Sequence, residues 1–239
     1  MTRIARVTLV AAAIAALLLL GAGWGVRLGA WDFRTGFSLL RWGAYLGLVA
    51  AIAALIQLGV PTLRPGRPGP LILALGLGVL AAAVPWYWRN RARSVPPIHD
   101  ITTDTADPPA FVAVLPLRAN APNPAGYGGE DVAAAQQQAY PDVRPLILPL
   151  APDAAFAHAL DAARSAGWEI VAADSTAGRI EATATTGWFG FKDDVVVRIR
   201  PADGGCRIDV RSVSRVGKSD VGANADRIRA YLRSLGAGG

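Results

Sequence analysis

Cysteine and histidine are scarce throughout this chain of 239 residues, and acidic residues are scarce in its N-terminal part. Cys206 is the single cysteine, which excludes an internal disulfide framework and a metal site made of several thiolates. It falls on the apolar side of a predicted strand, so we expect a small buried hydrophobe rather than a reactive thiol. The two histidines, His99 and His158, leave few candidates for histidine-based catalysis.

Several motifs of catalysis are also missing. No G-x-S-x-G nucleophile elbow occurs, and no Walker or Rossmann glycine pattern follows a predicted strand. His158 is expected on the flank of an amphipathic helix, in a packing role. His99 forms a loose cluster with Asp100, Asp104 and Asp107, but the spacing fits no metal motif. We therefore predict no catalytic residue, no metal site and no cofactor.

Acidic residues are almost absent from the first 88 residues, which contain seven arginines and only Asp32 as an acid. The rest of the chain has 17 basic and 17 acidic residues, so the net charge of +6 resides in the N-terminal part. A sequence pI of about 10.1 would suit nucleic-acid binding. Here the basic residues flank apolar segments, which is typical of a membrane topology signal, so we predict no nucleic-acid partner.

Three apolar segments have the length of about 20 residues that crosses a bilayer, namely 7–26, 37–60 and 70–88. They predict a transmembrane region over residues 1–93, with three helices in contact with membrane lipid. The first segment is longer than a signal-peptide core and no clean A-x-A site follows it, which favours a retained span over a cleaved signal. The loop charges nearly balance, but the basic start favours a cytoplasmic N-terminus and a periplasmic domain at the bacterial inner membrane.

Residues 94–144 are rich in proline, so we predict an extended connector along the surface of the following domain. Within it, "FVAVLPL" (111–117) is a candidate short strand. The segment "GEDVAAAQQQAY" (129–140) is a candidate short helix with its acids in the first turn. Regular structure is expected to begin at Pro145.

Residues 145–239 have the pattern of an α+β domain. The strand "PLILPL" leads into an amphipathic helix that begins at Pro152 and stops at Gly167. Four strands and a last helix, with Asn224 as its N-cap, follow. The order β-α-β-β-β-β-α predicts an antiparallel sheet covered on one face by two helices. The predicted strands are 145–150, 168–173, 178–186, 193–200 and 206–214, and the predicted helices are 152–166 and one from about residue 225.

Apolar and charged side chains alternate along the two longest strands. Val195 and Val197 share one face of the sheet with Ile208 and Val210. The opposite face is expected to be either a solvated set of cross-strand ion pairs, each worth about 0.2–1 kcal/mol, or a surface that binds an anionic headgroup or a partner. The charged members of this face are Glu181, Asp194, Arg198, Arg200, Arg207, Asp209 and Arg211. The turn "GWFGF" (187–191) is either an aromatic cap over the core or an exposed lip that contacts lipid or a partner.

The segment "DDVVVRIRPADGGCRIDVRSVSRVGKSDVGANADRIR" (193–229) closely resembles the hallmark of the domain-of-unknown-function 1499 family. That hallmark joins an Asp-Asp-Val strand, an Arg-Ser-x-Ser-Arg-x-Gly-x-Ser-Asp-x-Gly-x-Asn segment and an Arg-Ile helix. A weaker resemblance covers 98–235. It implies a form with an N-terminal membrane part, an unassigned activity and, since short members look like exported lipoproteins, a domain outside the cytoplasm. Short members carry an Asn-Cys-Val-Ser motif where this chain has "HDITTDTADPP", so nothing assigned to that cysteine transfers.

The hallmark segment has a local physical logic. Gly217 and Gly222 permit a sharp turn, and the polar side chains of the turn can accept backbone N–H bonds and cap the next helix. The serines of the strand are expected to bond backbone or Asp193, and its arginines to lie within reach of Asp194 or Asp209. The segment is therefore either a strand-turn-helix lock or, because basic residues lie beside a helix N-terminus, a site for an anion or another ligand. The candidate residues are Asp193, Asp194, Arg211, Ser212, Ser214, Arg215, Gly217, Lys218, Ser219, Asp220, Gly222 and Asn224.

Together these patterns predict a membrane-anchored envelope protein whose domain is a non-enzymatic binding or structural module. Its partner would be a lipid, a small anion or another envelope protein. The alternative is an uncharacterised hydrolase that uses Asp193 or Asp194 with a serine or histidine. The sequence does not indicate the oligomeric state.

Overall fold

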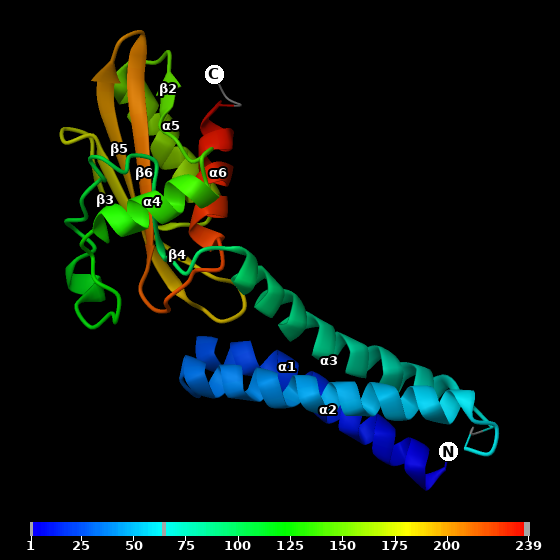
Figure 1. Ribbon diagram of the computed structural model, residues 1–239. Coiled ribbons are helices and arrows are strands. Elements are labelled where there is room, and N and C mark those ends of the chain that lie inside the picture. The colour runs from blue at the N-terminus through cyan, green and yellow to red at the C-terminus, as the bar shows by residue number, and fades with distance from the viewer. Residues whose placement is uncertain (1, 64–65, 237–239) are drawn as a thin grey trace. The chain divides into compact units, whose positions relative to one another are not determined.

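The structure is a computed structural model that describes residues 2–63 and 66–236. The chain divides into two compact units (Figure 1). The first contains the N-terminal helices, up to Arg91, together with Gly187–Gly190. The second contains residues 92–186 and 191–239.

Three long helices make up most of the first unit: α1 (Arg3–Arg27), α2 (Phe33–Gly59) and α3 (Gly69–Ser94). Each is long and apolar enough to cross a membrane, which confirms the three predicted apolar helices. Side-chain caps define the N-terminal ends of α1 and α2. The Thr2 hydroxyl accepts from the backbone N–H of Ala5, and the Asp32 carboxylate accepts from the N–H groups of the first turn of α2.

Glycines allow close approach between α2 and α3. A Cβ added to Gly78 would lie 2.5 Å from the carbonyl oxygen of Gly47, and one added to Gly47 would lie 2.8 Å from the Cβ of Ala81. In a bilayer the hydrophobic effect does not favour contact between apolar helices, because lipid tails are as apolar as the helix surfaces. Association of such helices therefore depends on close packing of small residues. The bundle therefore needs glycine at both positions.

Replacing Gly78 by leucine is expected to destabilise the bundle by about 1–3 kcal/mol, because the side chain would have to displace the α2 backbone. The measurement is the thermal unfolding of the full chain in detergent. Gly76→Leu is the matched control, since a Cβ at Gly76 meets nothing within 4 Å in the described structure. Equal melting temperatures for the two variants would contradict the proposed packing.

The aromatic turn falls in the first unit. Within that unit, the ring centroids of Phe189 and Phe37 lie 5.3 Å apart, and the indole N–H of Trp188 donates to the carbonyl of Leu20 at 3.4 Å. The two aromatic side chains thus pack on α1 and α2.

The second unit is built on a six-stranded antiparallel sheet with the order β1-β6-β5-β4-β3. The strand β2 pairs with β6 on the same edge as β1. Consecutive hairpins join β3 to β6, which confirms the predicted meander and the α+β class. The strands are β1 (Asp100–Thr102), β2 (Leu146–Leu148), β3 (Glu169–Asp174), β4 (Arg179–Thr185), β5 (Lys192–Ala202) and β6 (Gly205–Ser214).

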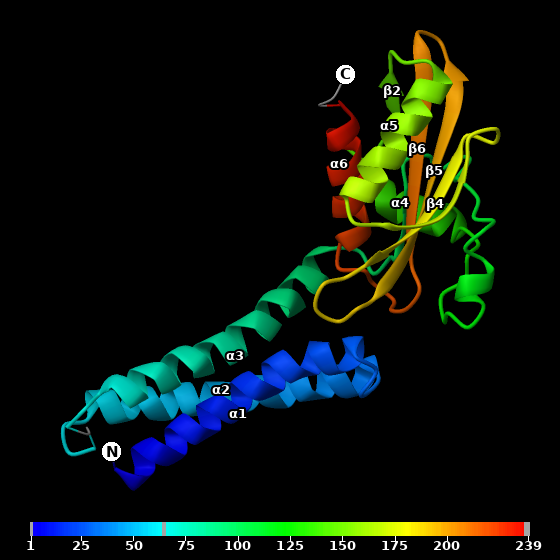
Figure 2. The ribbon, with the colours of Figure 1, turned by 180° about the vertical axis from the view of Figure 1, so that it is seen from behind.

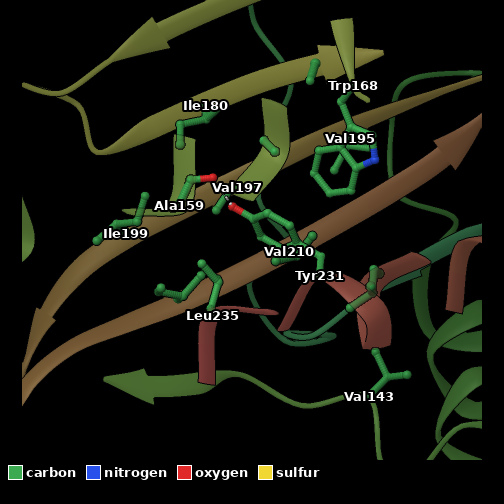
Figure 3. Packing of buried hydrophobic residues seen from close by; sticks show 14 of the residues in the cluster. Val143, Ala159, Trp168, Ile180, Val195, Val197, Ile199, Val210, Tyr231 and Leu235 are labelled. Atoms are coloured by element: carbon green, nitrogen blue, oxygen red, sulfur yellow. Dashed lines mark hydrogen bonds between the residues drawn. The ribbon is translucent and has the colours of Figure 1, made fainter. Parts of the chain in front are cut away.

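Two helices, α5 (Pro152–Ser165) and α6 (Ala223–Gly236), lie side by side on one face of the sheet (Figures 1 and 2). The helix α5 begins and ends within one residue of its predicted bounds, and α6 begins within about two residues of its predicted start. Trp168 stacks on Tyr231 of α6 with centroids 4.7 Å apart, and the Tyr231 hydroxyl donates to the carbonyl of Ala159 in α5 at 2.7 Å (Figure 3). This stack ties both helices to the sheet. Cys206 is buried in the same core, and burial raises the pKa of its thiol, as expected for a packing residue.

The proline-rich segment differs from the predicted connector. Its candidate strand 111–117 is wrong, because Pro116–Arg118 form a short 3-10 helix, η1. The segment also supplies β1 and α4 (Gly129–Ala139), whose predicted position is confirmed. Gln136 of α4 completes the outer edge of β1: its side chain accepts from the N–H of Thr102 at 2.9 Å and donates to the carbonyl of Thr102 at 2.6 Å.

The prediction of a solvated charged face is wrong for Glu181, Asp194, Asp209 and Arg211, which are buried, whereas Arg200 is exposed. Residues 103–127, here called the cover, fold over that face of the sheet. Phe111 and Val114 of the cover form a small core with Val196 and Val213. The apolar positions that share this face with the charged residues give the cover a place to pack, and the charges between them become buried. The buried charged residues on the cover side of the sheet are Asp100, Arg118, Glu181, Asp194, Asp209 and Arg211.

Candidate functional site

The predicted site residues divide between the two faces of the sheet, because successive side chains of a strand point in opposite directions. Asp193 lies opposite Ser214 on the helix-covered face, and Val195 lies opposite Ser212 on that face. Asp194 lies on the other face, beneath the cover. The helix side holds Asp193, Ser212, Ser214, Asp220 and Asn224, and the cover side holds Asp194, Arg211 and Arg215.

Asn224 is the centre of the network on the helix side. Its Oδ1 accepts from the Ser212 hydroxyl at 2.7 Å, and its Nδ2 donates to the Ser214 hydroxyl and to the His99 carbonyl, both at 3.0 Å. The prediction that Asn224 is the N-cap of the last helix is therefore wrong. Its side chain points into the core, where it joins β6, α6 and the start of β1. The serines bond Asn224 rather than the backbone or Asp193.

Asp220 takes the capping role instead. Its carboxylate accepts from the backbone N–H groups of Gly222 at 2.8 Å and Asn224 at 2.7 Å. Burial raises the pKa of Asp220, and the two N–H donors oppose that rise. Gly217 and Gly222 both adopt positive φ, which confirms the predicted need for a sharp turn, and Val221 between them is also at φ 58°.

The outer residues of the turn make weaker contacts. The Ser219 hydroxyl accepts from the N–H of Val221 at 3.1 Å. The Lys218 carbonyl lies 3.4 Å from Nδ1 of His99, and Lys218 itself is exposed. Of the predicted set, these two residues contribute least to the network.

Arg227 belongs to this network, although the sequence analysis did not select it. Its Nη2 donates to the Asp193 carboxylate at 2.5 Å, and its Nη1 donates to the Ser212 hydroxyl at 3.0 Å and to Oδ1 of Asn224. The sequence feature that could have identified Arg227 is its spacing of three residues from Asn224, which places both side chains on one face of α6.

Beneath the cover, Asp194 accepts from several donors at once. Nε and Nη2 of Arg215 bond its two carboxylate oxygens at 2.9 and 2.7 Å, and the Thr183 hydroxyl donates at 2.9 Å. Nη1 of Arg118 lies 3.3 Å away. The expected contact between Arg215 and Asp194 is confirmed. Burial lowers the pKa of Arg118, and the Asp194 carboxylate opposes that change.

Arg211 pairs with Asp100 rather than with Asp194 or Asp209. The two side chains form a bidentate pair at 2.9 and 2.8 Å. Arg211 also donates to the carbonyls of Pro109 at 3.2 Å and Ala125 at 2.8 Å. It therefore joins the sheet to both ends of the cover. Desolvation raises the pKa of Tyr127, whose ring lies against Arg211, to about 12.

Further charges hold the middle of the cover to the sheet. The Glu181 carboxylate accepts from the backbone N–H groups of Val112 and Val114, both at 3.0 Å. Nη1 of Arg215 donates to the carbonyl of Leu117 at 3.0 Å. The buried charges on this face thus satisfy backbone groups of an irregular segment that has few ladder partners.

The acids of the loose cluster near His99 each face arginines. Asp104 accepts from Arg207 at 2.7 Å and from Arg198 at 3.2 Å. Asp107 accepts from Arg200 at 2.9 Å, and this hydrogen bond lowers the pKa of its carboxyl. No group of three metal-ligating side chains occurs among the residues that the structure describes.

A groove of about 740 Å³ opens between α5 and α6. It exists because the facing positions of the helices are small, including Ala162, Ser165 and Ala230. The stacked Trp168 and Tyr231 line its floor. Arg227 also lines the groove, so the hydrogen-bond network of the hallmark segment reaches this surface through Arg227.

The hydrogen bonds given for the hydroxyls of Ser212 and Ser214 go to Asn224 and Arg227. The neighbours of the Ser212 hydroxyl are Asn224 and Arg227, and neither an amide nor an arginine acts as a general base. His158 and His99 contact backbone carbonyls, those of Leu235 and Lys218.

Comparison with known proteins gives one match. A family model described as a protein of unknown function (DUF1499) matches residues 100–235. No curated protein and no solved structure matches the chain. The matched range begins at β1 and therefore includes the cover as well as the sheet and its helices.

Proposed function

Because the chain belongs to the DUF1499 family of proteins of unknown function, the assignment has to come from its geometry, and we propose that it is a membrane-anchored binding module whose ligand occupies the groove between α5 and α6. The ligand class that suits the groove is a lipid-like amphiphile. We further propose a periplasmic domain at a bacterial inner membrane, since Arg3 and Arg6 lie in the first two turns of α1 and no acid accompanies them.

The groove carries this proposal. Its volume lies within the range of about 300–1,000 Å³ that small-molecule sites have. Its floor is aromatic and four of its lining residues are alanines, which leaves room for an apolar chain. The rest of the lining includes polar side chains, namely His158, Asp161, Ser165, Thr185, Arg227 and Ser234, which suit the polar part of an amphiphile. At one end, Arg227 is fixed by Asp193, Ser212 and Asn224 and is largely neutralised by Asp193. A polar acceptor group on the ligand, such as a carboxylate, a phosphate or an ester carbonyl, can approach the remaining N–H groups of Arg227.

Filling the groove should weaken binding of the ligand. We expect Ala230→Trp to weaken binding of a dansylated fatty acid by at least about 10-fold, because the indole would occupy the space between the helices. The measurement is a fluorescence titration of the full chain held in amphipol. The residue is exposed on α6, so the change should leave the fold intact.

Ala157→Trp is the matched control, since Ala157 is exposed on α5 but does not line the groove. It should bind the probe as the native protein does. A native protein that does not bind the probe, or two tryptophan variants with the same affinity, would overturn the proposal.

A further inference from the structure

Three aliphatic side chains point outward from one short stretch of the cover: Val112, Leu115 and Leu117, with exposed fractions of 51%, 43% and 56%. We call these three residues the apolar patch. Among the described residues of the second unit, Ile147 is the only other exposed large apolar side chain. The patch is therefore a local concentration, unlike the single exposed aliphatic residues that are normal on soluble surfaces.

The patch is held in place by the interior of the domain. Phe111 and Val114, which alternate with its members, pack inward against the sheet. The backbone on either side is fixed by the bonds of Glu181 to Val112 and of Arg215 to Leu117. The buried charges thus keep the three side chains on the outer side of the cover, at the cost of leaving them exposed to water.

A short tether joins the domain that carries this patch to an apolar helix. The apolar helix α3 ends at Ser94, and β1 begins at Asp100. The five residues between them can span no more than about 18 Å. The domain is therefore held close to the end of a membrane helix, and such tethering gives a weak contact with the bilayer a high effective concentration.

We propose that the apolar patch inserts into the boundary between the headgroups and acyl chains of the same membrane. Its composition favours lipid over a protein partner, because the centres of protein interfaces are enriched in aromatic residues and arginine, and the patch has neither. The arginines beneath it, Arg118 and Arg215, are directed inward to Asp194. Binding should therefore depend on apolar contact rather than on anionic lipid.

The test places an NBD fluorophore at Leu117→Cys in a Cys206→Ala background, with the full chain in phosphatidylcholine nanodiscs. We expect a blue-shifted emission and quenching by nitroxide-labelled lipid at least about 2-fold stronger than at the control site. The control is Ile147→Cys on β2, whose native side chain is exposed to 52%. Val112→Cys is a second probe of the patch, for use if the first variant does not fold.

Equal quenching at the patch and at Ile147→Cys would overturn the proposal. A probe that is water-exposed in nanodiscs but shielded in native membranes would also overturn it, because a protein would then cover the patch. Quenching that is unchanged when anionic phosphatidylglycerol is added supports apolar insertion, and quenching that appears only with phosphatidylglycerol contradicts it.

Discussion

Replacing Asp194 by alanine is expected to lower the free energy of unfolding of the soluble domain by about 3–5 kcal/mol. The carboxylate is fully buried and compensates both Arg215 and Arg118. Its removal leaves the buried guanidinium of Arg118 and the half-buried guanidinium of Arg215 without this carboxylate, and it also removes the acceptor of the Thr183 hydroxyl. The cover should loosen with the sheet, because Arg215 also holds Leu117.

Hydrogen exchange of the full chain in nanodiscs measures this effect, since the amides of β5 and β6 and of the cover can be followed separately. Asp161→Ala is the control. Its side chain is exposed to 75% and pairs with Arg164 at the surface, so its removal should change stability by no more than about 0.5 kcal/mol. Protection of β5 that is the same in both variants would show that the buried pairs contribute little.

Asn224→Ala should cost about 2–4 kcal/mol, the second-largest effect that the structure predicts. The change removes Asn224 as a partner of the buried Ser212 and Ser214 hydroxyls, and it removes one of two donors to the His99 carbonyl, which keeps the N–H of Ser214. Each unsatisfied buried group costs about 1–3 kcal/mol, and the costs are not fully additive because the groups share one network. The same hydrogen-exchange experiment, read at α6 and β6, gives the measurement.

Asn120→Ala is the matched control, because Asn120 is an exposed residue of the cover. It should leave exchange at α6 unchanged. The experiment also separates the two interpretations of the hallmark segment. An Asn224→Ala variant that unfolds easily supports a strand-turn-helix lock. One that keeps native protection but no longer binds the fatty-acid probe would show that the network serves the ligand and not the fold.

The sequence predicted well those features that follow from local pattern. The alternation around Val195 and Val197 placed the apolar and charged faces of the sheet correctly, because the side-chain period of a strand is fixed by its backbone. The three apolar helices followed from length and hydropathy alone. The glycines of the hallmark turn followed from their freedom to adopt positive φ.

The misplaced features depend on partners that lie far apart in the chain. Asn224 matches a local N-cap preference, but its actual partner His99 is 125 residues away. The apolar residues of the cover suggested a short strand at 111–117, but that local pattern did not show that the segment would fold onto the sheet. Residues such as Arg118 and Asp194 become neighbours only when the cover folds onto the sheet. The sequence shows that both residues are charged, but it does not show which charged residues pair.

The sharing of one edge of β6 by β1 and β2 has a consequence for where the domain begins. The strand β1 precedes the cover in the chain and β2 follows it, and both pair with the outer edge of β6. This edge of the sheet is therefore completed by segments that come before β3 to β6 in the sequence. A chain cut just before Pro145 would keep the four-stranded meander but leave the outer N–H and C=O groups of residues 211–213 open. An open strand border of this kind recruits strands from other copies, so the independent folding unit has to start upstream of β1.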